Sequence, residues 1–267
     1  RGAVEYSGRK TEFHGYDLLT LDGKITAIYK GGSAVPAIAA GDSAVIVLDR
    51  TPFYAESGGQ AGDKGAISSG SGEVEVFDTL KAGDSIVHLG RVVRGIIKEK
   101  DAVSAWVSGE SRAMIKRNHT ATHLMHYALG KVLGAHVHQA GSVVDSERLR
   151  FDFSHTKKME EKELERVEDI VNEIIASGLA VKKEVMDKER AVKGGAMALF
   201  GEKYDRMVRV VTCGDSVELC GGTHADSSGE IGLFKIKSEG SIAAGTRRIE
   251  ALTGGLAADF MRSDLGR

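Results

Sequence analysis

The first hundred residues alternate between apolar and polar positions in short segments, which Gly-rich turns separate. A period of two is typical of strands that bury one face. The pattern predicts strands at residues 24–29, 44–49, 72–77, 85–93 and 102–107. Short strands at this regular spacing, joined by turns, indicate a small β-barrel.

The period changes from two to between three and four after Ser111. The residues that recur on one face of the predicted helix are Ile115, His119, Thr122, His123, His126 and Leu129. We expect this helix to end near Gly134, because glycine is common just past a helix C-terminus. The change of period places a domain boundary here, with a β-barrel domain at residues 1–110 and a second domain at residues 111–267.

The second domain mixes helix and strand signals without a regular βαβ alternation. Strands are predicted at residues 142–144, 149–154, 180–186, 207–213, 231–237 and 248–252. A charged helix is predicted at residues 158–177, closed by Gly178. Helices and antiparallel-looking strands therefore segregate, which predicts an α+β fold: an N-terminal small β-barrel followed by an α+β core.

Composition narrows the class of protein. The chain has 267 residues, of which 42% are hydrophobic and 28% are charged, so it can bury a core and is not disordered. Its 36 Lys and Arg residues nearly balance 38 Asp and Glu residues. This balance excludes a broadly basic surface but leaves a local basic patch open. We find neither a run of about 18 apolar residues nor a signal peptide, and expect a soluble cytoplasmic protein. The start at Arg1 without Met favours a fragment or a processed form.

Two short motifs carry candidate chemistry. His119 and His123 stand four residues apart on the predicted helix, so both imidazoles can converge on one ion. Far along the chain, a thiol and an imidazole share the segment Cys220-Gly221-Gly222-Thr223-His224. Three imidazoles and one thiolate match the tetrahedral, borderline-soft preference of Zn²⁺. We therefore expect one zinc ion per chain, held by His119, His123, Cys220 and His224.

The histidine motif differs from that of zinc proteases, because no Glu follows His119 to act as general base. If all four residues bind the ion at once, its four coordination positions are all filled by the protein, which is typical of structural zinc. Catalysis would need a displaced ligand, a fifth position, or a metal that only anchors the substrate. These alternatives stay open on the residues alone.

Five separated motifs resemble the editing region of alanyl-tRNA synthetase. Two of them are the metal motifs, of which the second extends to Glu218-Leu219-Cys220-Gly221-Gly222-Thr223-His224. The other three are RTPFYAESGGQ at residues 50–60, LRFDFSH at residues 149–155 and GAMALFGEKY at residues 195–204. The resemblance runs from about Thr11 to Met261. Free-standing AlaX-type deacylases and the editing domain of threonyl-tRNA synthetase share the zinc motifs.

The resemblance implies an aminoacyl-tRNA deacylase, whose parent enzyme would be an alanine–tRNA ligase. It implies a barrel like those of translation factors, a catalytic core that hydrolyses seryl and glycyl esters of tRNA for alanine, and zinc at the four ligands above. Thr122 and Gln139 are implied in the substrate pocket. The aminoacylation and C-terminal domains of the family are missing, so we expect no alanine activation and only weak binding of whole tRNA.

A pocket sized for a methyl group cannot reject glycine, and it rejects an added hydroxyl by only about a hundredfold, so a second hydrolytic site is needed. Thr122 lies three residues after His119 on the same helix face, where its hydroxyl can bond a serine side chain. Alternatively, Thr122 bonds a helix carbonyl. Gln139 can both donate and accept, which suits an amino group, an ester carbonyl or an attacking water.

Other polar residues are weaker candidates. Asp145 and Asp152 are candidate acceptors for the metal imidazoles, although Asp in turns is commonly a local cap. Arg247 and Arg248 alternate across a predicted strand, so one can face phosphates of the terminal adenosine. Gly58 and Gly59 offer backbone N–H groups to a phosphate or to the neighbouring domain.

These observations predict a zinc-dependent ester hydrolase that edits, in cis or in trans, the 3′ end of tRNA for alanine. Thr122, Gln139 and Cys220 are its predicted catalytic residues, and we expect no DNA or membrane partner. The oligomeric state stays open. Two alternatives remain: an RNA-binding module with structural zinc, and a zinc hydrolase of an unrelated small ester.

Overall fold

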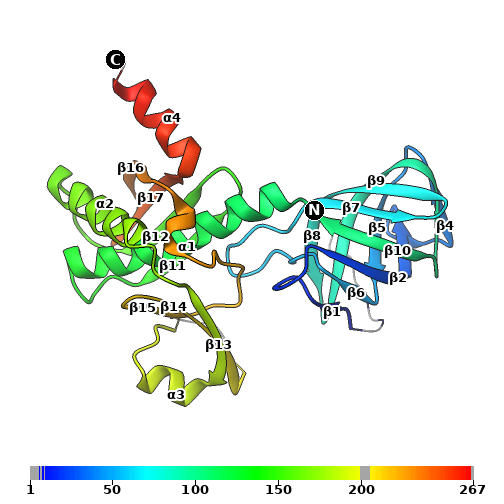
Figure 1. Ribbon diagram of the computed structural model, residues 1–267, viewed down its shortest axis with the longest axis horizontal. Helices are drawn as coiled ribbons and strands as arrows, with labels where there is room; N and C mark the ends of the chain where they lie inside the picture. Colours follow the sequence, from blue (N-terminus) through cyan, green and yellow to red (C-terminus); the bar gives the residue numbers. More distant parts are fainter. Residues whose placement is uncertain (1–5, 7, 9, 199–204, 266–267) are drawn as a thin grey trace. The chain divides into compact units, whose positions relative to one another are not determined.

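The computed structural model describes residues 6, 8, 10–198 and 205–265. The chain divides into two compact units. The first consists of Arg1–Ser57 and Ala61–Arg112, and the second of Gly58–Gln60 and Ala113–Arg267. Figure 1 labels the elements of both units.

The first unit is a closed antiparallel barrel of six strands, joined in the order β10-β7-β8-β9-β5-β2. A further pairing of β10 with β2 closes the ring, so Ala105 of β10 lies opposite both Leu21 and Ile67. The strands are β2 (Thr20–Lys30), β5 (Ser43–Leu48), β7 (Gly65–Ser69), β8 (Gly72–Ala82), β9 (Ser85–Lys98) and β10 (Ala102–Val107). Short strands β1 (Glu12–Phe13), β3 (Ser33–Ala34), β4 (Ala37–Ala39) and β6 (Arg50–Thr51) complete the unit.

Five of these six barrel strands were predicted, and β7 was not. Its sequence, Gly-Ala-Ile-Ser-Ser, has low strand propensity and only one large apolar residue, Ile67. Ile67 is fully buried in the barrel core, together with Ile25, Ile46 and Leu48. Pairing on both sides, with β8 and β10, holds this segment as a strand in spite of its composition.

The second unit is built on the long helix α1 (Gly109–Leu133), most of which belongs to it. A four-stranded antiparallel sheet has the order β11-β12-β17-β16. Its strands are β11 (Gln139–Val144), β12 (Leu149–Ser154), β16 (Phe234–Ala243) and β17 (Thr246–Thr253). A shared core includes Leu124 and Leu129 of α1, Phe151 of β12 and Val171 of α2 (Glu161–Ala176).

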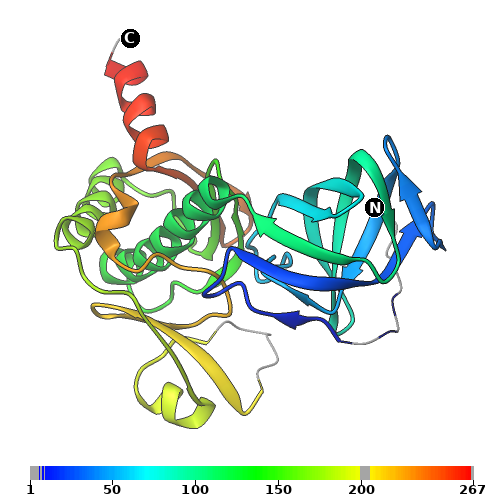
Figure 2. The same ribbon diagram turned by 45° about the vertical axis from the view of Figure 1, so that its right-hand side comes forward.

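A second sheet of this unit has the order β13-β14-β15, with all pairs antiparallel. Its strands are β13 (Lys182–Asp187), β14 (Met207–Cys213) and β15 (Ser216–Leu219). The remaining elements are α3 (Lys188–Lys193), η1 (Ser228–Ile231) and α4 (Gly254–Leu265). Figure 2 shows α3 beside the β13–β14 pair.

The α+β fold class with an N-terminal barrel is thus confirmed. The predicted helix at residues 158–177 corresponds to α2, and Gly178 follows it with a φ of +59°, a conformation that favours glycine. In the second unit, sequence patterning missed β15 and α3, which have four and six residues, and α4, which begins with two glycines. None of the helices in the described part of the chain combines the length and apolar character needed to cross a membrane.

Candidate metal centre

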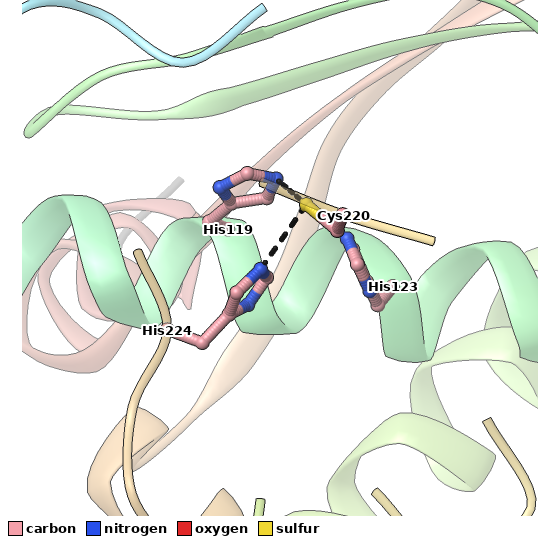
Figure 3. A group of neighbouring side chains, drawn as sticks. All are labelled: His119, His123, Cys220 and His224. Carbon is pink, nitrogen blue, oxygen red and sulfur yellow. Dashed lines mark hydrogen bonds between the residues drawn. The ribbon is translucent and has the colours of Figure 1, made fainter. Parts of the chain in front are cut away.

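Helix α1 and the loop after β15 bring four ligand-type side chains together. The ligand atoms of His119, His123, Cys220 and His224 all lie within 4.8 Å of one another and could hold a metal ion. Cys220 Sγ lies 3.4 Å from His119 Nε2 and 3.3 Å from His224 Nε2 (Figure 3). The two histidines of α1 lie on successive turns and point toward the Cys220 loop.

The shape of the Cys220–His224 loop depends on Gly222. A Cβ atom at this position would lie 2.1 Å from the His119 ring and 2.8 Å from Gln60 Oε1, so no larger residue fits. Arg209 holds the same loop from β14. Its Nη1 donates to Cys220 O at 3.1 Å and to Gly222 O at 2.8 Å, and its own carbonyl accepts from Cys220 N at 2.9 Å.

Each imidazole has a polar group at its outer nitrogen. His119 Nδ1 lies 2.7 Å from Gln60 Oε1, and His224 Nδ1 lies 3.2 Å from Thr120 Oγ1. An amide oxygen only accepts, so His119 carries its proton on Nδ1 and leaves the Nε2 lone pair toward Cys220. His123 Nδ1 lies 3.5 Å from Glu218 Oε2. Outer hydrogen-bond partners orient imidazoles for metal binding, as at His119 and His224, whereas His123 Nδ1 makes no hydrogen bond with the described residues.

Gln60 joins the two halves of the cluster. It is fully buried. Besides accepting from His119, Gln60 Oε1 accepts from Thr223 N at 2.8 Å, while Gln60 Nε2 donates to Thr223 Oγ1 at 2.8 Å. One side chain therefore holds helix α1 and the Cys220–His224 loop in position relative to each other.

The electrostatics of the cluster favour neutral imidazoles. Burial, and then the neighbouring His123 and Arg209, lower the pKa of His119 well below its usual value. Burial, His119, His123, Arg209 and Lys183 do the same to the pKa of His224. Burial also lowers the pKa of His123, although Glu218 opposes it. Neutral imidazole is the form that binds a metal, because its lone pair is free.

Glu218 is a buried carboxylate shared by two histidines. Its Oε1 accepts from His126 Nδ1 at 2.9 Å, while Oε2 faces His123. Burial acts to raise the pKa of Glu218, but His123 and the hydrogen bond from His126 together lower it. His126, which the helical period placed on the same face as His119 and His123, is thus a buried partner of this carboxylate. A borderline-soft cation such as Zn²⁺ suits this donor set of three buried imidazole nitrogens and one partly buried sulfur.

The outer partners were missed in the sequence. Asp152 was expected to orient a metal imidazole, but it binds the Arg248 guanidinium through both oxygens, at 2.7 and 2.8 Å. Asp145 caps its own turn by accepting from Glu147 N and Arg148 N. Gln60 and Thr120 contact His119 and His224 instead, and Glu218 is the carboxylate that faces His123. Gln60, Thr120 and Glu218 could have been found in the sequence only by their positions. Gln60 ends the RTPFYAESGGQ motif, and the other two lie within the metal motifs.

The predicted substrate residues are arranged as follows. Thr122 is buried, and its Oγ1 donates to Asn118 O at 2.8 Å, the helix-carbonyl bond considered as its alternative. Gln139 is half-buried at the start of β11, where its Nε2 donates to Ser142 Oγ at 3.2 Å. A register shift separates Gln139 from Gly141 in the pairing with β12.

The predicted phosphate contacts are engaged elsewhere in the second unit. Arg247 binds both oxygens of Glu239, and Arg248 binds Asp152, as described above. Gly58 and Gly59 have φ values of +59° and +85°. Gly59 O accepts from Val144 N at 2.8 Å, which holds this loop on β11. Residues 199–204 of the GAMALFGEKY motif lie outside the described residues.

Comparison with known families agrees with this architecture. Residues 2–111 match tRNA synthetases class II (A), and residues 208–250 match the threonyl and alanyl tRNA synthetase second additional domain. The second match contains Cys220 and His224, half of the metal cluster. The chain is thus related to class II tRNA synthetases and their editing domain, and these families imply tRNA as a partner. More specifically, both matches are consistent with the editing region of an alanyl-tRNA synthetase.

Proposed function

We propose that this chain is an aminoacyl-tRNA deacylase, which removes serine and glycine wrongly esterified to tRNA for alanine. The observation that carries the proposal is the cluster of three buried histidines, His119, His123 and His224, with the partly buried Cys220, in a chain that matches the threonyl and alanyl second additional domain. The setting would be an alanine–tRNA ligase of the cytoplasm. Residues 1–110 would form its barrel domain and residues 111–267 its editing domain.

One zinc ion held by these four residues would supply Lewis-acid chemistry to the ester. The chain's own residues prepare that site. Gln60 and Thr120 hydrogen-bond His119 and His224, Glu218 lies 3.5 Å from His123 Nδ1, and Arg209 holds the backbone around Cys220. We propose Cys220 as a ligand that keeps its thiolate toward the ion.

Thr122 would read the serine side chain. Because its hydroxyl proton is directed to Asn118 O, its oxygen lone pairs are what it can offer a substrate. A serine hydroxyl can donate to that oxygen, whereas the methyl group of alanine cannot. Gln139 would contact the amino group, the ester carbonyl or the attacking water.

The backbone of Gly58 and Gly59 stays a proposed contact for substrate. Arg247 and Arg248 would have to exchange a bidentate carboxylate partner for phosphate, and such paired hydrogen bonds are among the stronger ones in proteins. Their present partners instead tie β17 to β16 and β12, which supports the sheet beside α1.

The deciding experiment measures release of serine from seryl-tRNA for alanine, with zinc-loaded and zinc-stripped protein. We expect the stripped protein to stay folded and to lose hydrolysis, which returns with zinc. Wholesale unfolding without zinc, with RNA binding as the only activity of the loaded protein, would favour the structural-zinc RNA-binding module. Failure on every aminoacyl-tRNA tested would favour a zinc hydrolase of an unrelated small ester.

A further inference from the structure

The sheet β13-β14-β15 has two unlike faces, and the register separates them. Residues paired across antiparallel strands point to the same side. Met186 pairs with Val208, and Val210 pairs with Leu219. These four residues form an apolar cluster with Ala191 of α3, so this part of the face is covered.

The opposite face begins at the metal cluster and ends in solvent. At one end, Val211 enters the main core and Glu218, its partner on β15, reaches His123. At the other end, Val185 pairs with Arg209 and Asp187 pairs with Met207. Val185 is 66% exposed and Met207 is 53% exposed. Two large apolar side chains therefore lie on one open sheet face that leads away from the metal cluster.

The distance between this apolar pair and the metal cluster is short. Arg209 bridges them, because it pairs with Val185 on one side and exchanges backbone and side-chain hydrogen bonds with Cys220 on the other. Neighbouring strands are about 4.8 Å apart, so Val185 lies roughly 10 Å from the Cys220 backbone. A ribose with its base spans about that length.

We propose that this open face, made of Val185, Met207, Arg209 and Lys183, holds the terminal nucleoside of the tRNA 3′ end, with its base on Val185 and Met207. The proposal rests on the proposed function, in which the ester joined to that nucleoside is hydrolysed at the metal cluster. Bases of single-stranded RNA bind on exposed apolar and aromatic side chains beside cationic groups, without a base-specific code.

The charges beside the face suit a phosphate. Lys183 lies opposite Val211 and Arg209 lies opposite Val185, so both cationic side chains belong to this face. The carboxylates nearby already have partners: Asp226 pairs with Lys183, and Asp187 pairs with Arg206 and caps α3. In this proposal a phosphate would contact Lys183 and Arg209, whose present partners are Asp226 and the carbonyls of Cys220 and Gly222.

The test uses the whole zinc-loaded chain and a labelled RNA strand that ends in CCA with a free 3′ hydroxyl, measured by fluorescence anisotropy at fixed salt. The double variant Val185→Ser/Met207→Ser removes both apolar side chains from the open face. The matched control is Val192→Ser, which removes an apolar residue of α3 that is 48% exposed but outside this face. Circular dichroism and urea unfolding show whether each variant is folded.

We expect the double variant to bind the RNA about fivefold more weakly or worse, and Val192→Ser to stay within twofold of the wild type. A second RNA that lacks only the terminal base separates base contact from general damage. Wild type and double variant should bind this RNA equally, because an RNA without the terminal base cannot contact Val185 or Met207 in either protein. KM for seryl-tRNA should rise in the double variant by a larger factor than kcat falls.

Equal binding of the CCA strand by wild type and double variant would overturn the proposal, even if zinc-dependent hydrolysis is found. No measurable binding by the wild type would also overturn it, as would a defect that persists with the RNA lacking the terminal base. Conversely, base-dependent binding through Val185 and Met207 without any deacylation would refute the proposed function and leave this RNA contact standing.

Discussion

Gln60 Oε1 lies 2.7 Å from His119 Nδ1, although 59 positions separate the two residues. Through Thr223, the same amide also holds the loop that carries Cys220 and His224. The metal cluster is therefore assembled around a buried side chain that is not itself a ligand.

Replacing Gln60 with Ala should lower zinc affinity by about 10- to 100-fold, the usual effect of losing an outer hydrogen-bond partner. The measurement is competition with a chromophoric chelator. Gln139→Ala is the matched control, because Gln139 bonds Ser142 and no metal-cluster residue in the described structure. We expect Gln139→Ala to keep its zinc and lose hydrolysis. Equal zinc affinity in Gln60→Ala and the wild type would refute the role of Gln60.

The purified chain should carry about one equivalent of zinc, because buried sites with nitrogen and sulfur donors bind this ion tightly. Metal analysis gives the stoichiometry, and Cys220→Ala should reduce it. After chelation, zinc should restore seryl-tRNA hydrolysis while Mg²⁺, which prefers oxygen ligands, should not. Full activity in metal-free wild type would end the zinc hypothesis.

Thr122→Val keeps the side-chain shape and removes the hydroxyl that faces Asn118 O. Since an unpaired buried polar group costs about 1–3 kcal/mol, seryl hydrolysis should slow by about 5- to 150-fold. Glycyl hydrolysis should change much less, because glycine has no side-chain hydroxyl. The readout is kcat/KM for seryl, glycyl and alanyl esters at equal zinc occupancy.

Thr122→Ser is the control for that variant, because it retains the hydroxyl and should retain most seryl hydrolysis. If Thr122→Val leaves the ratio of seryl to alanyl hydrolysis unchanged, the discriminating contact lies elsewhere. Gln139 would then be the next residue to test.

His88 should make the barrel sensitive to acid. It is fully buried, with Nδ1 3.0 Å from Ile46 O and Nε2 2.8 Å from Thr51 Oγ1. Burial lowers the pKa of His88 to about 4, although the Ile46 hydrogen bond opposes the shift. Below about pH 6.5 the unfolded chain binds this proton and the folded chain does not, so stability falls as pH drops toward 4.

The loss attributable to His88 should reach about 3 kcal/mol by pH 4, from a pKa difference of about 2.5 units at 1.36 kcal/mol each. Urea unfolding can be followed by fluorescence of Trp106, the single tryptophan, which lies in barrel strand β10. His88→Gln should be less stable than the wild type at pH 7.5, and the difference should narrow as pH falls. Parallel stability curves would contradict this assignment.

Local periodicity was sufficient for much of the fold. Five barrel strands, helix α1 and helix α2 follow from periods of two and 3.6 residues, because each strand or helix buries one face. Strand β7 does not, since its glycine and serine residues form a strand only between β8 and β10. One of these two neighbours, β10, lies more than 30 residues away in the sequence, so local periodicity does not reveal its pairing with β7.

The sequence by itself determined the ligand types of the metal cluster, because His119 and His123 are one helical turn apart and Cys220 and His224 share one short loop. Only the tertiary structure decided what surrounds them. Gln60 rather than Asp152 bonds an imidazole, and Asp152 bonds Arg248. The hydrogen-bond partner of a buried side chain depends on which segments pack together, because a buried polar group bonds a donor or acceptor that lies within reach in the folded chain. Local sequence patterns therefore do not predict these partners, which lie far apart in the sequence.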